Sequence, residues 1–280
     1  MMKYVTRGTL AALALGTVSM TAEAQLIVGN DQSGTATIWH IDVATGVATS
    51  LYSASTSEAK PWGMAYDPAT NTLYWNNGSN LYSSPFNIGG LTPTLLGGMT
   101  YNGSSVNFVG LGFRNGMLVG TRNIATEAVY EIDPATRVAS LVYQYSSAFD
   151  HGGVDVDFTT GLLYGLSDST TGGQGRGLYE IDTANQTETF RAPYFNGETD
   201  LDGLAVHNGI AYYVSDGPNT TQANFYVVDI ATGTQLGTLP SPFTGSGVFS
   251  AAAFIAPIPA PGALALLGLA GLTGLRRRRR

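Results

Sequence analysis

The sequence predicts an all-β protein built as a single five-bladed β-propeller with four-stranded blades. Three observations lead to this prediction. A unit of about 47 residues recurs along the chain, each unit supplies the segments of one four-stranded sheet, and one strand is left over after the last unit. The 36 glycines among 280 residues suit short strands joined by tight turns.

The clearest part of the repeat is a hairpin whose turn is opened by an aspartate. Its side chain can accept a hydrogen bond from the backbone two residues further on, and a nearby Gly or Asn can take the left-handed turn position. The four turn aspartates are Asp42, Asp133, Asp182 and Asp229. Successive aspartates are 91, 49 and 47 residues apart, so the first interval holds two repeats. The hairpin of the additional repeat begins at Asn80 and lacks the aspartate.

A second unit precedes each hairpin and starts on a glycine, at Gly63, Gly110, Gly153 and Gly203. Residues 26–30 and the first hairpin supply three strands of the first sheet, and residues 248–256 supply a spare strand. We expect this last strand to complete the first blade, because closure leaves no unpaired sheet edge in the ring. A two-sheet sandwich is the alternative, but it does not explain the regular period.

The repeats resemble those of secreted YVTN and NHL propellers, through the Y-x-I-D-x-x-T-G hairpin and the G-L-A-V strand at Gly203. The resemblance covers the predicted domain, residues 25–256. It implies the propeller fold and no particular activity, since this fold hosts many functions.

Residues 1–24 have the order of features of a secretory signal peptide. Lys3 and Arg7 form a basic start, an apolar stretch follows, and Ala22-Glu23-Ala24 provides the small residues of a cleavage site. The sequence therefore predicts an exported protein whose mature chain begins near Gln25.

Residues 257–280 combine prolines, a short apolar segment and a basic end. Residues 262–275 carry no charge, and at about 1.5 Å per residue they span roughly 21 Å, less than a bilayer core of about 30 Å. The arginines are expected to stay on the cytoplasmic side. These arginines are Arg276, Arg277, Arg278, Arg279 and Arg280.

This tail resembles the PEP-CTERM sorting domain of bacterial surface proteins. The matching element is Pro259-Ala260-Pro261, in which Ala260 replaces the family's usual Glu. The resemblance implies a transient membrane anchor, processing by an exosortase-type membrane protease, and delivery to the cell envelope or the extracellular space. A plain membrane anchor is the alternative.

The charge of the predicted domain limits its partners. Residues 25–256 contain six basic and nineteen acidic side chains, a net charge of −13. Such a field repels nucleic acids and anionic lipids, and it suits cations or neutral polar ligands. The chain contains no cysteine, so it has neither disulfides nor a thiol nucleophile.

We expect a polar site at the mouth of the central channel, where the loops before each first strand and after each second strand meet. The candidate ligand-binding residues are Trp62, Asp150, His151, Asp155, Asp168, Asp200, Asp202 and Asp216. Trp62 can offer an apolar platform to a sugar. A Ca²⁺ ion is possible at four of the aspartates, since it takes several oxygen ligands. These are Asp150, Asp155, Asp200 and Asp202. Alternatively, the carboxylates only satisfy loop backbone.

We predict a non-catalytic binding or scaffold module for exopolysaccharide or a surface protein. The first alternative is a carbohydrate-active hydrolase or lyase, in which Asp155 with Asp200 or Asp202 would be the acid/base pair. The second is an ice- or mineral-binding surface protein. No cofactor other than Ca²⁺ is predicted.

Overall fold

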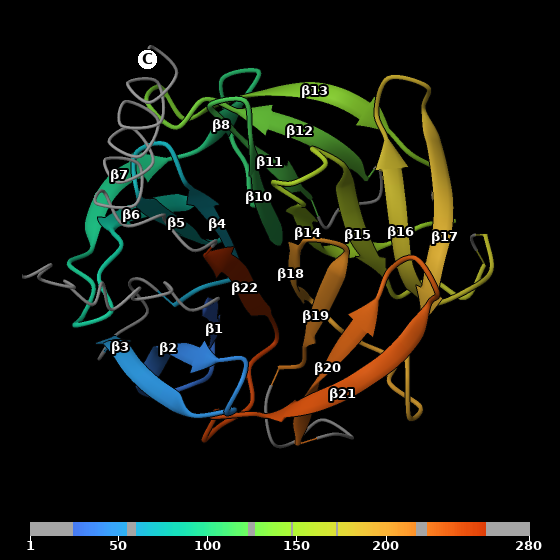
Figure 1. Ribbon diagram of the computed structural model, residues 1–280. Coiled ribbons are helices and arrows are strands. Elements are labelled where there is room, and N and C mark those ends of the chain that lie inside the picture. The colour runs from blue at the N-terminus through green and yellow to red at the C-terminus, as the bar shows by residue number, and fades with distance from the viewer. Residues whose placement is uncertain are drawn as a thin grey trace, which may run out of the picture. The chain divides into compact units, whose positions relative to one another are not determined.

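The computed structural model describes residues 25–54, 60–122, 127–146, 148–171, 173–216 and 223–255. Within these residues the chain forms five sheets arranged as the blades of a ring, and the four main strands of each blade are antiparallel (Figure 1). The predicted five-bladed propeller is therefore confirmed. The predicted signal peptide and sorting tail lie outside the described residues. No helix among the described residues is long and apolar enough to cross a membrane.

Within each blade the strands follow one another from the centre of the ring outwards. Blade 1 consists of β22 (Ser250–Ile255), β1 (Gln25–Asn30), β2 (Ala36–Asp42) and β3 (Ala48–Ala54). Blade 2 consists of β4 (Gly63–Asp67), β5 (Thr72–Asn77), β6 (Asn80–Pro85) and β7 (Thr94–Gly98).

The other three blades have the same order. Blade 3 consists of β10 (Gly110–Arg114), β11 (Met117–Thr121), β12 (Ala128–Ile132) and β13 (Val138–Gln144), with the hairpin of β8 (Thr100–Tyr101) and β9 (Ser104–Ser105) added at its outer edge. Blade 4 consists of β14 (His151–Val156), β15 (Leu163–Ser167), β16 (Gly177–Asp182) and β17 (Thr187–Pro193). Blade 5 consists of β18 (Gly203–His207), β19 (Ile210–Val214), β20 (Asn224–Asp229) and β21 (Thr234–Pro240).

The last strand closes the ring as predicted. β22 pairs with β1 along its whole length, from Gln25 opposite Ile255 to Asn30 opposite Ser250. The innermost strands β4, β10, β14, β18 and β22 contact one another in a cycle. The first blade is thus built from both ends of the domain, and β1 is paired on both sides, with β22 and with β2.

The hairpin turns confirm the role predicted for their aspartates. Asp42 Oδ1 accepts hydrogen bonds from the N–H of Ala44 at 2.8 Å and of Thr45 at 3.2 Å. The left-handed turn position is held by glycine in two repeats, at Gly46 and Gly233. In the other two it is held by Arg137 and Gln186, where the sequence led us to expect Gly or Asn.

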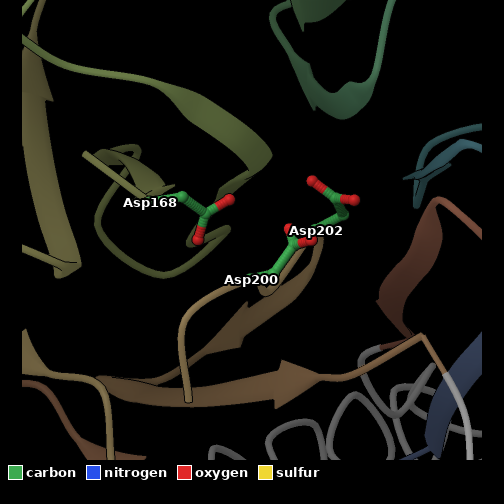
Figure 2. A group of neighbouring side chains, drawn as sticks. All are labelled: Asp168, Asp200 and Asp202. Carbon is green, nitrogen blue, oxygen red and sulfur yellow. The ribbon is translucent and has the colours of Figure 1, made fainter. Parts of the chain in front are cut away.

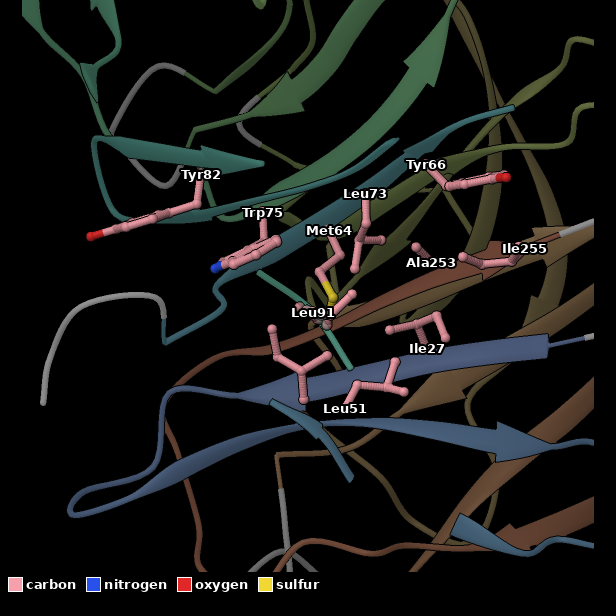
Figure 3. Close-up of a cluster of buried hydrophobic side chains, with 12 residues drawn as sticks. Ile27, Leu51, Met64, Tyr66, Leu73, Trp75, Tyr82, Leu91, Ala253 and Ile255 are labelled. Carbon is pink, nitrogen blue, oxygen red and sulfur yellow. The ribbon is translucent and has the colours of Figure 1, made fainter. Parts of the chain in front are cut away.

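The apolar core lies mainly between neighbouring blades. In the cluster between blades 1 and 2, Ile27 and Leu51 of one blade meet Met64, Leu73 and Trp75 of the next (Figure 3). The Trp75 side chain is fully buried, and its ring stacks on that of Tyr82 at 6.0 Å between centroids. Burial of such aromatic rings holds each blade against its neighbour.

In blades 2, 3 and 4, a glycine at or near the start of the innermost strand is required by the close approach of the next blade, namely Gly63, Gly110 and Gly153. A Cβ on Gly110 would lie 2.6 Å from the carbonyl oxygen of Gly152 and 2.7 Å from the amide nitrogen of Val154. These are backbone atoms of the next innermost strand, so they cannot rotate away. The recurring glycine therefore sets how closely the blades pack at the centre.

Candidate functional site

Three aspartates of blades 4 and 5 converge at the channel mouth. Asp168 directly follows β15, while Asp200 and Asp202 lie just before β18. One carboxylate oxygen from each lies within 4.8 Å of the others, and Figure 2 shows the three side chains turned toward a common space. We name these three residues the aspartate triad.

The triad is held together by hydrogen bonds between the two blades. Asp168 Oδ1 accepts from the hydroxyl of Tyr194 at 2.7 Å and from the N–H of Leu201 at 3.2 Å. Leu201 lies between the other two members of the triad, so this bond fixes their loop against the end of β15. Burial raises the pKa of Asp168 to about 8, with a smaller contribution from the negative charge of Asp200.

Asp202 is the most buried member of the triad. The residue is 7% exposed, and its carboxylate makes no hydrogen bond to any part of the chain that the structure describes. It packs over Gly152, where a Cβ would overlap its Oδ1 atom. Burial raises the pKa of Asp202 well above its usual range, and the charge of Asp216 adds to this effect.

A cavity of about 410 Å³ opens beside the triad. It is bounded by blade 4, by the loop before β18 and by the segment before β22. Its lining residues are Asp150, Gly152, Asp168, Arg176, Thr199, Asp200, Asp202, Val248 and Phe249. The Arg176 guanidinium donates from Nε to the backbone carbonyl of Asp168 at 2.8 Å. The cavity thus has an acidic wall, one cationic side chain and an aromatic edge.

A second cavity, of about 420 Å³, lies over blades 2 and 3. Its lining residues are Trp62, Ser105, Val106, Asn107, Val109, Arg122 and Phe249. The rings of Trp62 and Phe249 contact each other, with centroids 4.4 Å apart and planes tilted by 36°. Because Phe249 also lines the acidic cavity, this aromatic pair stands where the two cavities meet.

Asp31 and Asp216 hold the segment that carries Phe249. Asp31 Oδ1 accepts from the N–H of Val248 at 2.7 Å and of Phe249 at 3.0 Å. The backbone carbonyl of Asp216 accepts from Gly247 N at 3.2 Å. The Asp216 side chain is buried, and burial, followed by the charge of Asp200, raises its pKa to about 8.

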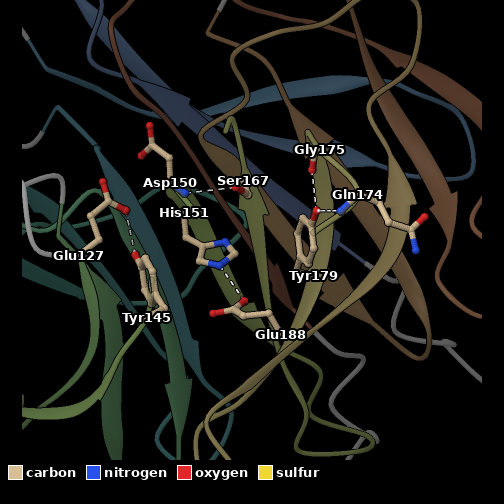
Figure 4. A network of polar contacts seen from close by, with 9 residues as sticks. All are labelled: Glu127, Tyr145, Asp150, His151, Ser167, Gln174, Gly175, Tyr179 and Glu188. Atoms are coloured by element: carbon tan, nitrogen blue, oxygen red, sulfur yellow. Dashed lines mark hydrogen bonds and ion pairs between the residues drawn. The ribbon is translucent and has the colours of Figure 1, made fainter. Parts of the chain in front are cut away.

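A further carboxylate, Glu127, lies beside Asp150 and was not expected from the sequence. Its Oε2 accepts from the hydroxyl of Tyr145 at 3.1 Å (Figure 4). Burial raises the pKa of Glu127 to about 8, and the charge of Asp150 adds to the shift. No sequence signal pointed to Glu127, because it precedes an ordinary third strand.

Two predicted site residues lie away from both cavities. His151 is buried between blades, where its Nε2 contacts Glu188 Oε2 at 2.8 Å and its ring stacks on Phe149 (Figure 4). Asp155 is 2% exposed, and its Oδ2 accepts from the N–H of Val206 at 2.7 Å. Of the other predicted residues, Trp62 lines one cavity, and Asp150, Asp168, Asp200 and Asp202 line the other. Asp216 lines neither cavity, but it lies near enough to Asp202 for its charge to act on that carboxyl.

The mouth also contains residues that sequence reasoning missed. Phe249 and Arg176 line the cavities, and neither was among the predicted site residues. A signal for Phe249 was available, because it lies directly before the innermost strand of blade 1, at the position that Trp62 holds before the innermost strand of blade 2.

Comparisons with known proteins identify no family. No known protein family and no curated protein matches the sequence. Among solved structures, a chain of the nidogen/laminin complex is 11% identical, with a TM-score of 0.49, and the match covers 84% of this chain and 99% of that one. The hydrazine synthase of Kuenenia stuttgartiensis is 12% identical, with a TM-score of 0.42. That match covers 64% of this chain and 49% of the synthase chain.

Proposed function

We propose that the propeller is a non-catalytic binding module of the bacterial cell envelope and that its ligand is an extracellular polysaccharide. The observation that carries this proposal is the contact between Trp62 and Phe249 at the junction of two polar cavities. Sugars present apolar C–H faces and rings of hydroxyl groups, so an aromatic surface flanked by hydrogen-bonding groups suits them.

The polar groups beside the aromatic pair fit neutral, hydroxyl-rich ligands. Asn107 and Arg122 line one cavity, and Asp150 and Asp200, both exposed at the other, can accept hydrogen bonds from hydroxyls. The net charge of −13 over residues 25–256 disfavours polyanions. A neutral polysaccharide therefore suits the mouth better than a sulfated or uronate-rich one.

A glycan array with the full chain tests this function. Trp62→Ala should weaken retention on the bound glycan by about tenfold, since the loss of one aromatic contact is worth about 0.5–1.5 kcal/mol beyond buried area. Trp62→Phe, which keeps an aromatic ring, should retain most of the binding. Equal retention of wild type and Trp62→Ala on every bound glycan would contradict the proposed site.

The same array separates the alternatives. Release of shortened glycans by the wild type would point to the hydrolase or lyase. Of the residues predicted for that activity, Asp200 and Asp202 line the cavity and lie within 4.8 Å of each other, whereas Asp155 does not line it. If the protein neither binds nor cleaves any glycan but captures one surface protein, a protein partner would be favoured.

The location in the envelope rests on the two ends of the chain, outside the described residues. We propose export by residues 1–24 and sorting by residues 257–280, with processing by an exosortase-type protease. Mass spectrometry of the protein recovered from its own cells tests this. A mature chain that begins near Gln25 and lacks the terminal arginines supports the proposal, and a chain that retains residues 276–280 contradicts the cleavage.

A further inference from the structure

The aspartate triad has the dimensions of a site for one hard divalent cation. Ca²⁺ binds oxygen ligands at about 2.3–2.6 Å, so two oxygens on opposite sides of one ion lie about 5 Å apart. The three carboxylate oxygens of Asp168, Asp200 and Asp202 all lie within 4.8 Å of one another. These separations are of the size found between oxygens bound to a single ion.

The second observation is independent of this clustering and concerns Asp202 alone. Asp202 is more than nine-tenths buried, its side chain receives no hydrogen bond from the described residues, and it is turned into the triad (Figure 2). A buried carboxylate without a partner is costly, and buried charges in proteins are normally paired or bound to metal. Two other buried aspartates do receive hydrogen bonds: Asp155 accepts from the N–H of Val206 and Asp157 from the N–H of Gly209.

No cationic side chain among the described residues neutralises Asp202. Arg176 lines the same cavity, but its Nε donates to the backbone carbonyl of Asp168. No ion pair to a triad carboxylate is present in the part of the chain that the structure describes. Additional acidic groups, Asp216 and Asp150, lie near enough to act on Asp202 electrostatically. The surroundings of the triad therefore attract a cation.

We propose that Asp168, Asp200 and Asp202 bind one Ca²⁺ ion at the channel mouth. The donor set contains only carboxylate oxygens, the ligands that Ca²⁺ prefers, and lacks the His nitrogen or Cys sulfur found in most Zn²⁺ sites. Mg²⁺ demands near-ideal octahedral geometry and gives up its water reluctantly, whereas Ca²⁺ accepts an irregular shell. Asp200 is exposed, so water can complete that shell. The Ca²⁺ site includes Asp168 in place of the sequence-predicted Asp150 and Asp155.

Calorimetric titration of the full chain with CaCl₂, after removal of metal with EDTA, tests this site. We expect one ion bound per chain and a rise in the melting temperature at millimolar Ca²⁺. Asp200→Asn should weaken Ca²⁺ binding at least tenfold. Asp182→Asn, in an exposed hairpin turn, is the matched control and should bind Ca²⁺ like the wild type.

Asp202→Asn provides a second readout that a merely structural aspartate would not give. This variant should melt at a higher temperature than the wild type in EDTA, because a buried carboxylate without a partner is removed, and should show no further rise with CaCl₂. Absence of heat and of any melting shift at Ca²⁺ concentrations on the order of 10 mM overturns the site. Binding that survives both substitutions, or an equal response to MgCl₂, overturns it as well.

The Ca²⁺ site does not depend on the polysaccharide ligand, because the titration contains no glycan. If the wild type binds Ca²⁺ but no glycan, only the polysaccharide proposal fails. If it binds a glycan in EDTA but no Ca²⁺, only the Ca²⁺ site fails.

Discussion

Asp155 on the innermost strand of blade 4 accepts a hydrogen bond from the backbone N–H of Val206 on the innermost strand of blade 5, at 2.7 Å. The carboxyl is buried, and burial raises its pKa well above the usual range of an aspartate. Two adjacent blades are thus joined at the centre of the ring by a side chain that lies outside both cavities of the channel mouth.

Substitution of Asp155 should affect stability and leave ligand binding unchanged. Asp155→Ala removes the acceptor for Val206 N–H, and leaving that donor unsatisfied should cost about 1–3 kcal/mol in urea unfolding. Asp155→Asn keeps an oxygen acceptor in a side chain of the same shape, so its free energy of unfolding should fall less than that of Asp155→Ala. If Asp155→Asn folds normally but loses glycan binding or hydrolysis, the side chain acts in the function and the structural interpretation is wrong.

The buried pair of His151 and Glu188 should be far more important for stability than an exposed ion pair. The side chains are 0% and 3% exposed. Glu188→Ala leaves the His151 Nε2 atom buried without its hydrogen-bond partner, which typically costs about 1–3 kcal/mol. Chemical denaturation monitored by tryptophan fluorescence measures the difference.

The matched control for Glu188 is Glu131, whose carboxylate pairs with Arg114 at 3.2 Å and is 35% exposed. Glu131→Ala should change the free energy of unfolding by only about 0–1 kcal/mol. Similar losses in the two variants would show that burial does not decide the strength of these pairs.

Glu127 should make the protein less stable as the pH rises from 4.5 to about 8. Its pKa is raised from 4.5 to about 8 in the folded state, chiefly by burial. Within this window the folded protein retains a proton that the unfolded chain has released, so rising pH favours unfolding. The contribution of Glu127 to stability is fully present below its pKa in the unfolded chain and is lost above its pKa in the folded protein.

Glu127→Gln removes this titration. Urea unfolding at pH 5, 6, 7 and 8 should therefore show the variant gaining stability relative to the wild type at each step, with the largest difference at pH 8. A difference between the two proteins that stays constant over this range would mean that Glu127 holds no extra proton in the folded state.

Gly110 should not tolerate a side chain. A Cβ at this position would lie within 2.6 Å of the carbonyl oxygen of Gly152, so Gly110→Ala forces two innermost strands apart and should cost about 1–3 kcal/mol. Gly98 is the control, because a Cβ there meets no atom within 4 Å. Thermal unfolding of Gly110→Ala and Gly98→Ala should separate the two positions, and equal melting temperatures would contradict the proposed role of Gly110 in packing.

The number of blades and their closure followed from the sequence alone. Strands and turns are local features, so the turn aspartates Asp42, Asp133, Asp182 and Asp229 and the strand glycines recur visibly in the residue order. The leftover strand at Ser250–Ile255 then had one free partner, the first strand of the domain. Closure needed no knowledge of side-chain positions, because an unpaired edge is unfavourable whatever its residues.

The composition of the candidate site was decided by the tertiary structure. Asp155 and Asp202 were both predicted as site residues, but their surroundings differ. Asp155 lies on a strand, where side chains alternate between faces, and accepts a hydrogen bond from Val206 on the neighbouring strand. Asp202 lies in a loop, whose path depends on distant contacts, and faces a cavity. Asp168 lies in the triad because it accepts a hydrogen bond from Leu201, 33 residues away in the sequence. Phe249 contacts Trp62 only because the ring brings the two ends of the domain together. Repetition along the chain determined the scaffold, whereas contacts between distant loops determined which side chains meet at its mouth.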